Sequence, residues 1–261
     1  MRRTLVLVVV LGVLVGVTGC LQVQGTLGPG PTPPGPGPTV ETPTVETPAA
    51  VPGLPEGKMV ASKNAVNAVP MAAAPIKADG VLDEPAWKTA VAMTDFVLGR
   101  DKSPVQAKVL LTWDKDNLYV AVINDEPMTD KLVTQIKDRE GAVWEDDSVE
   151  VYVDPENTKA GDNTDYSGFF VSAANVVYDR RQSEAWTAPW TSGTKVIAGK
   201  AWVAELAIPW KSLEVTPKVG HKFGLMVARD RKAGGKSEDI YLVPCGEEAK
   251  DTSTYPTFEL K

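Results

Sequence analysis

The chain has little of what most metal, redox and nucleic-acid sites are built from. It contains one histidine, His221, and two cysteines, Cys20 and Cys245, among 261 residues. A single imidazole excludes a multi-histidine metal site and a haem held by two histidines. The net charge is −7 and no cluster of Lys or Arg is present, so the chain lacks the basic surface that nucleic acid requires. The sequence also shows neither a glycine-rich phosphate loop nor a Ser/His/Asp set.

A long apolar run is missing as well, and one short run stands at the N-terminus. Two arginines precede an apolar segment from Leu5 to Val17, which is shorter than the ~20 residues that cross a bilayer as a helix. Val17-Thr18-Gly19-Cys20 is typical of a bacterial lipobox, although an ordinary secretory signal with a chance cysteine is the alternative. We expect residues 1–19 to be a signal peptide and Cys20 to carry lipid. The mature protein is then anchored in the bacterial cell envelope, facing outside the cytoplasm, and Cys245 has no intrachain disulfide partner.

The composition changes between residues 20 and 75. Gly, Pro and Thr make up almost all of residues 28–38, and Thr39-Val40-Glu41-Thr42-Pro43 is repeated at once as Thr44-Val45-Glu46-Thr47-Pro48. Too few large apolar side chains are present to offset the entropy of ordering this stretch. We therefore expect residues 20–75 to be a disordered, polyproline-like linker that holds a folded domain, residues 76–261, away from the membrane.

Most of the remaining sequence has the pattern of β-strands, and helical periodicity is scarce. Short alternating or apolar runs separated by Gly, Pro, Asn and Asp predict strands. We predict strands over residues 108–113, 118–123, 148–154, 168–173, 194–198, 201–208, 223–229, 240–243 and 255–260. Short helical turns are expected near residues 84–90 and 210–213. Many short strands in one domain favour an all-β antiparallel sandwich or jelly roll.

One predicted strand combines a core face with a polar face. Residues 148–154 alternate, with three valines on one face and Glu150, Tyr152 and Asp154 on the other. Trp144 stands at the entrance to this strand. An aromatic plate beside fixed hydrogen-bonding groups suits a sugar, because its C–H face packs on a ring and its hydroxyls need polar partners. The alternative is an acidic sheet edge with a half-buried tryptophan.

Hydrolysis of a sugar is a second possibility for this strand. Glu150 and Asp154 lie four residues apart, or ~13 Å along a strand. Retaining glycosidases need two carboxyl groups only ~5–5.5 Å apart, so a second acid from a neighbouring strand would be required. We expect a non-catalytic protein.

A polar loop in the middle of the domain is a candidate for structural calcium. Asp162, Asn163 and Asp165 group the hard oxygen ligands that this ion prefers. Asp146 and Asp147 are alternative ligands. The spacing is not that of an EF-hand, and a polar turn without an ion accounts for the same residues.

Four motifs follow one another along the domain. They are residues 78–87 (Ala-Asp-Gly-Val-Leu-Asp-Glu-Pro-Ala-Trp), residues 109–120 with their Trp-Asp turn, residues 144–150 (Trp-Glu-Asp-Asp-Ser-Val-Glu) and residues 204–210 (Ala-Glu-Leu-Ala-Ile-Pro-Trp). No single motif is diagnostic, but their order resembles that of family 9 carbohydrate-binding modules and their relatives. The resemblance implies a jelly-roll β-sandwich of the DOMON-like superfamily that binds a polysaccharide or oligosaccharide.

The resemblance also implies a sugar clamp, which this sequence matches in part. The family holds a sugar between two tryptophans; Trp144 matches the first and Glu150 matches a polar contact. Residues 245–255, before the last strand, contain no tryptophan, and Phe170 stands where the family has an arginine. A replacement plate could come from the segment that contains Trp186 and Trp190. The candidate sugar-binding residues are therefore Trp144, Glu150, Tyr152, Trp186 and Trp190.

An incomplete clamp leaves a rival function open. The same sandwich could serve as an envelope scaffold that contacts protein and has lost its sugar site. The position of Trp144 separates the two hypotheses. An exposed Trp144 that lines a groove favours a sugar, whereas a fully buried one favours the scaffold.

Overall fold

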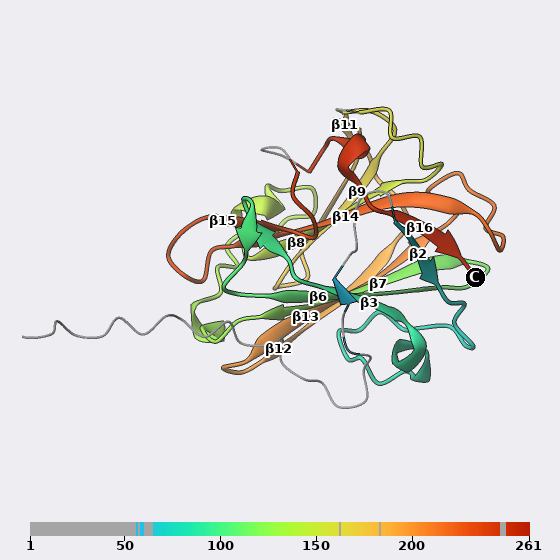
Figure 1. Cartoon of the computed structure of the whole chain (residues 1–261). Helices are drawn as coiled ribbons and strands as arrows, with labels where there is room; N and C mark the ends of the chain where they lie inside the picture. The colour runs from blue at the N-terminus through green and yellow to red at the C-terminus, as the bar shows by residue number, and fades with distance from the viewer. Residues whose placement is uncertain (1–55, 57, 60–64, 162, 183, 246–248) are drawn as a thin grey trace, which may run out of the picture. The chain divides into compact units, whose positions relative to one another are not determined.

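The computed structural model describes residues 56, 58–59, 65–161, 163–182, 184–245 and 249–261. Within these residues the chain forms two β-sheets and four short 3₁₀ turns (Figure 1). The predicted signal peptide, Cys20 and most of the predicted linker lie outside them. A search of the described part of the chain finds no helix with the length and apolar character of a membrane span.

The smaller sheet has the strand order β1-β3-β6-β7-β13-β12. Its strands are β1 (Lys58–Met59), β3 (Val91–Thr94), β6 (Ala107–Trp113), β7 (Asn117–Asp125), β12 (Thr191–Ile197) and β13 (Ala201–Pro209). Neighbouring strands are antiparallel except β1 and β3, which are parallel. The predicted hairpin is confirmed, since β6 and β7 pair across the turn at residues 114–116.

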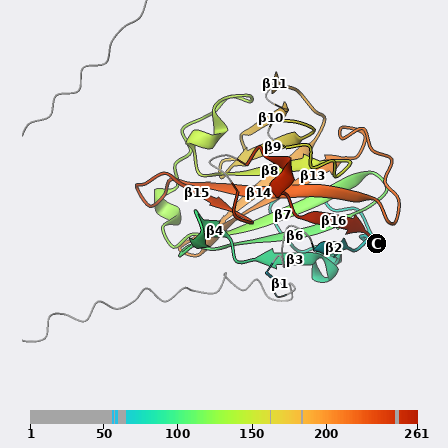
Figure 2. The same cartoon turned by 45° about the horizontal axis from the view of Figure 1, so that its top comes forward.

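The larger sheet has the order β11-β10-β9-β8-β14-β15-β4-β5, and β16 pairs with both β14 and β2 (Figure 2). Its strands are β2 (Val66–Val69), β4 (Val97–Leu98), β5 (Asp101–Lys102), β8 (Ser148–Asp154), β9 (Ser167–Ser172), β10 (Val177–Arg181), β11 (Glu184–Ala185), β14 (Lys222–Arg231), β15 (Glu238–Tyr241) and β16 (Thr257–Leu260). The 3₁₀ turns are η1 (Pro85–Thr89), η2 (Thr129–Lys131), η3 (Val143–Glu145) and η4 (Thr252–Thr254). The central strand β8 lies between β9 and β14.

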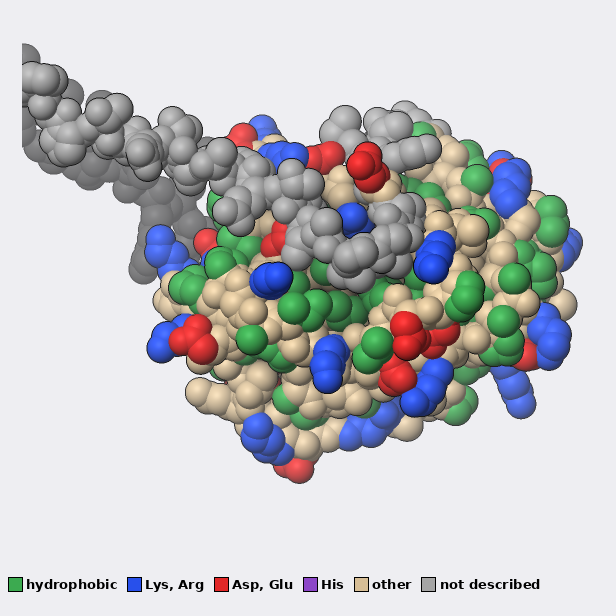
Figure 3. Space-filling model, turned by 90° about the horizontal axis from the view of Figure 1, so that it is seen from below, with side chains coloured by type: hydrophobic (Ala, Val, Ile, Leu, Met, Phe, Trp, Pro, Cys, Tyr) green, Lys and Arg blue, Asp and Glu red, His purple; other side chains and the backbone are tan. Residues whose placement is uncertain are grey.

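The core lies between the two sheets, which confirms the predicted β-sandwich. The three valines of β8 are fully buried in one apolar cluster with side chains of β6, β7 and β13. A smaller cluster covers the other face of the smaller sheet, where Trp87 of η1 packs with Leu110 and Tyr119. Cys245 is half-buried against the main core. On the face seen in Figure 3, hydrophobic side chains lie in small groups between charged ones.

The strand β2 lies inside the stretch that was predicted to be linker. It pairs in parallel with β16, Val69 is fully buried, and Met71 forms a bridge with Trp113. The prediction of a disordered linker as far as residue 75 is therefore wrong at its carboxyl end, and residues 65–75 belong to the domain. Four residues of weak alternation carry no clear strand signal, because the partner strand stands at the far end of the chain.

Glu205 of β13 joins the first and last sequence motifs. Its buried carboxylate accepts hydrogen bonds from the backbone amides of Asp79 (3.1 Å) and Gly80 (2.6 Å) and from the indole of Trp87 (2.8 Å). Gly80 has a φ of 85°, and a Cβ there would lie 2.5 Å from the backbone of Thr194. The Asp-Gly turn therefore fits closely against β12 while its amides bind the acid of β13.

A buried ion pair ties the two sheets together at another point. Arg229 of β14 is fully buried and donates to the Glu126 carboxylate (3.0 Å) and to the carbonyl of Asp125 (2.8 Å) at the end of β7. Arg231 donates to the same carboxylate at 2.7 Å. Burial lowers the pKa of Arg229 to about 10. Because removing one partner would leave a buried charge alone, this network fixes β14 relative to β7.

We predict that Glu205→Gln lowers the free energy of unfolding by about 1–3 kcal/mol. Both carboxylate oxygens accept N–H groups, and a glutamine must turn its own NH₂ towards one of these donors. Denaturant unfolding measures the change. Glu156→Gln, at an exposed side chain after β8, is the matched control and should change stability by less than ~0.5 kcal/mol. Equal stability of the two variants would show that Glu205 does not hold the motifs together.

Candidate functional site

A groove of about 430 Å³ lies on the face of the larger sheet that points away from the smaller sheet. Three of the predicted site residues come together there, since Trp144, Glu150 and Tyr152 all line it. The lining also includes Arg180 of β10, Ala228 and Asp230 of β14, Lys232 after β14, Asp239 and Tyr241 of β15, and Lys250. All side chains of the lining except Ala228 and Ala249 carry a polar, charged or aromatic group, so the groove suits a polar ligand.

Trp144 lines one side of the groove. It lies in η3, and 39% of its surface is exposed, while its neighbour Val143 is fully buried. Its ring forms T-shaped contacts with Phe170 and Tyr178, with interplanar angles of 86° and 83°. The exposed part of the indole is an apolar surface on which the C–H face of a sugar can pack.

Asp146 and Asp147, the second and third of the three acids that follow Trp144, hold its turn in place. Asp146 accepts the backbone amides of Gln135 (2.7 Å) and Ile136 (3.0 Å), and Asp147 accepts those of Val133 (2.8 Å) and Lys232 (3.0 Å). Both carboxylates are buried. Their oxygens accept backbone N–H groups, and calcium ligation by Asp146 and Asp147 stays a prediction.

Glu150 lies on the floor of the groove beside Ala228, its partner on β14. Tyr152 is almost fully buried and donates its hydroxyl to the Glu150 carboxylate. Burial raises the pKa of Glu150 to about 7, against this hydrogen bond, which lowers it. Tyr152 therefore positions the acid, and its own ring presents little surface to a ligand.

Asp230 is a second acid in the groove, and it comes from the strand next to β8. It accepts the Ser148 hydroxyl at 2.6 Å and is diagonal to Glu150, because Ser148 pairs with Asp230 and Glu150 with Ala228. Burial raises its pKa well above the usual range, and the nearby Glu150 raises it further. A glycosidase needs one carboxyl that stays ionised beside one that is protonated. Here burial raises the pKa of both acids, Glu150 to about 7 and Asp230 well above its usual range.

The groove also holds groups that the sequence analysis missed. Arg180 lines it from β10, where it pairs with Gly168, so the basic group expected at the position of Phe170 comes from the next strand. Tyr241 of β15 adds a second aromatic ring. Phe170, Glu150, Ala228 and Tyr241 form one row across four adjacent strands. Trp144 stands above one end of this row, and the small Ala228 leaves space in its middle.

The structure does not bring Trp186 and Trp190 to the groove. Both rings contact Phe169, which points to the opposite face of β9 from Phe170. Trp190 is buried and donates its indole N–H to Asp179 at 3.0 Å, and Trp186 lies 4.4 Å from the guanidinium of Arg181. The prediction that either replaces the missing plate is wrong, because their segment covers the core side of the sheet.

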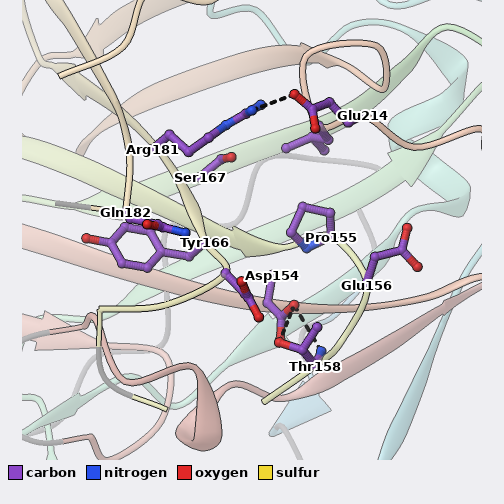
Figure 4. Close-up of a pocket in the computed structure, with 11 residues that line it drawn as sticks. Asp154, Pro155, Glu156, Thr158, Tyr166, Ser167, Arg181, Gln182 and Glu214 are labelled. Atoms are coloured by element: carbon purple, nitrogen blue, oxygen red, sulfur yellow. Dashed lines mark hydrogen bonds and ion pairs between the residues drawn. The ribbon is translucent and has the colours of Figure 1, made fainter. Parts of the chain in front are cut away.

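A second cavity, of about 440 Å³, is a weaker candidate site (Figure 4). Its ring, Tyr166, is 1% exposed, and its cation, Arg181, is already paired with Glu214 and bonded to the Ser212 carbonyl. The Asp154 carboxylate accepts the backbone amide of Thr158 at 3.0 Å. The Arg181 guanidinium and the Asp154 carboxylate of this cavity are thus engaged with the protein itself.

The loop predicted to hold calcium borders this second cavity. Asp165 lines it, the Asn163 amide donates to the carbonyl of Lys250 at 3.1 Å, and Asp162 lies outside the described residues. Among the residues that are described, no three His, Cys, Asp or Glu side chains are grouped closely enough to hold a metal ion. A calcium site at Asp162, Asn163 and Asp165 stays a prediction.

The groove lies in a region of the chain that matches a known protein family. The sequence model of the "Carbohydrate family 9 binding domain-like" family matches residues 78–261. The chain belongs to this family. The match starts at the Asp-Gly turn bound by Glu205 and includes all residues that line the groove. The matched region is a carbohydrate-binding domain and not a catalytic one.

Curated relatives contain a similar domain within much longer proteins. The chain is 31% identical over 191 residues to endo-1,4-beta-xylanase A of Thermotoga neapolitana, which covers 70% of this chain and 17% of that enzyme. It is 31% identical over 207 residues to exoglucanase XynX of Acetivibrio thermocellus, which covers 76% of this chain and 17% of that enzyme. Because the similarity spans about a sixth of each enzyme, the family 9 domain is shared and their activities are not implied.

Solved structures share the fold. A family 9 module from Caldicellulosiruptor kristjanssonii in complex with cellotriose superposes with a TM-score of 0.59 and 17% identity, over 75% of this chain and 94% of that one. A putative carbohydrate-binding protein from Bacteroides uniformis gives 0.58 and 14%, over 75% and 97%. At this identity the comparison shows the family 9 β-sandwich and leaves the ligand open.

We predict that Glu150→Gln changes how stability depends on pH. The folded-state pKa of about 7 lies above the ordinary value of 4.5, so between these values the folded state binds more protons than the unfolded state. The wild type should therefore lose stability as the pH rises from about 4.5 to about 7, and the variant should lose less. Melting temperatures from pH 4.5 to 8 test this. Glu145→Gln, at an exposed acid of the same segment, should follow the wild type; parallel curves for all three proteins contradict the prediction.

Proposed function

We propose that this domain binds carbohydrate in the Trp144 groove and does not catalyse. The observation that carries the proposal is the exposed indole of Trp144, which makes T-shaped contacts with two other rings and lines a groove of mostly polar and charged side chains. An exposed tryptophan leaves apolar surface in contact with water, which is unfavourable. A sugar ring covers that surface on binding. A fully buried Trp144 would favour the scaffold alternative, whereas the exposed ring favours the sugar.

The polar groups around the plate complete the proposed site. Glu150 can accept or donate hydrogen bonds with sugar hydroxyls, depending on its protonation, and Tyr152 fixes its orientation. Tyr241 stands beyond Ala228 as a second aromatic contact. A ligand that lies over Ala228 would contact both rings and the carboxyl between them. The solved relatives in complex with cellotriose and with glucose make β-linked glucose and xylose oligomers the first ligands to test.

We predict that Trp144→Ala weakens binding of cello- or xylo-oligosaccharides by about 1–2 kcal/mol, or roughly five- to thirtyfold. The loss of stacking area is the cause, and isothermal titration calorimetry measures it. Trp144→Phe keeps a smaller plate and is the matched control, with an intermediate affinity. Melting temperatures of the variants are followed in parallel, since Trp144 also contacts Phe170 and Tyr178. Absence of binding by the wild type to every sugar tested would leave the scaffold alternative in place.

For the whole protein we propose a lipid-anchored sugar-binding role in the bacterial cell envelope. The support is the lipobox at Cys20 and the Pro-, Thr- and Gly-rich composition that follows it. Lipid on Cys20 would attach the chain to a membrane, and the linker would let the groove reach a polysaccharide some distance away. The partners of the protein are then a glycan on one side and a membrane on the other.

We predict that the wild type enters the detergent phase in Triton X-114 partitioning and that Cys20→Ser stays in the aqueous phase. Lipid on the cysteine accounts for the difference, because acyl chains transfer to detergent micelles. Cys245→Ser is the matched control and should partition like the wild type. If Cys20→Ser and the wild type partition alike, the chain is not a lipoprotein.

A further inference from the structure

Two cations in the groove have no acidic partner within ion-pair distance among the described residues. Arg180 donates its Nε to the carbonyl of Gln182 at 2.6 Å, and Lys232 donates its Nζ to the hydroxyl of Ser237 at 2.8 Å. Arg181, Arg229 and Arg231, by contrast, each form an ion pair with a glutamate. The two groove cations thus differ from these arginines, in a chain whose net charge is −7.

These cations reach the groove from its two sides. Arg180 is on β10, two strands from β8, while Lys232 follows β14 on the other side of β8. Gly168 lies between Tyr152 and Arg180 in the pairing register, and a Cβ there would lie 3.0 Å from the Arg180 side chain. The glycine therefore gives the arginine room to cross the sheet. Lys250 adds a third cation to the lining.

The acids of the groove offset the positive charge of Arg180 and Lys232 less than the number of acids indicates. Glu150 accepts the Tyr152 hydroxyl, and Asp230 accepts the Ser148 hydroxyl. Burial raises the pKa of both acids, so both hold protons at a higher pH than an exposed carboxyl does. Asp239, the remaining acid of the lining, is exposed. Below neutral pH, Glu150 and Asp230 therefore carry less negative charge than two exposed carboxyl groups would.

We propose that the groove is selective for an acidic saccharide, with Trp144 stacking on the sugar ring and Arg180 and Lys232 holding its anionic group. The anionic group is a carboxylate, as in a uronic acid, or a sulfate ester. A planar guanidinium and an ammonium both bind such oxygens through charge-assisted hydrogen bonds. This inference rests on the proposed sugar-binding function and names the class of sugar that the site takes.

The experiment titrates the full chain with matched pairs of ligands by calorimetry. One pair is a xylo-oligosaccharide with and without a glucuronic acid branch, and the other is a galactan oligosaccharide with and without sulfate esters. We expect one acidic member to bind roughly tenfold or more tightly than its neutral partner. The preference should shrink as salt is raised from about 0.05 to 0.5 M, because the ions screen exposed charges. The pair that shows the preference identifies the anionic group.

Variants test whether the two cations cause the preference. Arg180→Gln and Lys232→Gln should each lower the ratio of acidic to neutral affinity by roughly tenfold. Arg181→Gln, which faces the second cavity, and Lys236→Gln, which is exposed in the loop after Lys232, remove the same charge and should keep the ratio. Melting temperatures confirm that each variant is folded.

The outcomes separate this inference from the function on which it rests. Equal affinity for the acidic and neutral members of both pairs overturns the acidic-saccharide inference and leaves sugar binding standing. No binding to any of the four ligands, by a wild type that melts cooperatively, overturns both. A preference that survives Arg180→Gln and Lys232→Gln together overturns the assignment of these two residues.

Discussion

The groove depends on two buried carboxylates that accept hydrogen bonds from backbone amides. Asp146 and Asp147 accept five amide hydrogens, two of them from the loop after β14 and three from residues 133–136. Burying an acid is costly unless donors surround it, so these loops and the acids fix one another. The turn carrying Trp144 and the loop carrying Lys232 form two sides of the groove. Loss of Asp147, which follows Trp144 by three residues and binds the Lys232 loop, would therefore disturb both the stacking surface and the charge beside it.

The parts of the fold that could be predicted from the sequence are those written in local patterns. The alternation from Ser148 to Asp154 assigned the buried valines and the groove face correctly, because each residue of a strand points opposite to its neighbour. The order of the four motifs identified the family, which the match over residues 78–261 confirms. Each of these signals lies within one short segment of the sequence. It can therefore be recognised without knowing which distant segments pack against that segment.

What could not be predicted depends on which segments become neighbours. Val66–Val69 looked like linker because its partner β16 is at the other end of the domain. Arg180 was missed because β10 reads as a polar stretch, and only its pairing with β9 brings the arginine to the groove. The prediction that Trp186 and Trp190 reach the groove was wrong because the local sequence does not determine which face of the sheet their segment covers. Pairing and coverage are set by tertiary packing, and tertiary packing overrides local preference.

The contrast between Trp144 and the other tryptophans has a spectroscopic consequence. The chain has seven tryptophans; Trp87, Trp113, Trp190, Trp202 and Trp210 are buried, Trp186 is half-buried, and Trp144 is the most exposed of them. Indole emission moves to longer wavelength in water and is quenched by small solutes that reach the ring. The red edge of the intrinsic fluorescence therefore comes mainly from the groove. The intrinsic fluorescence of Trp144 can therefore report whether the groove surface is exposed to water or covered by a ligand.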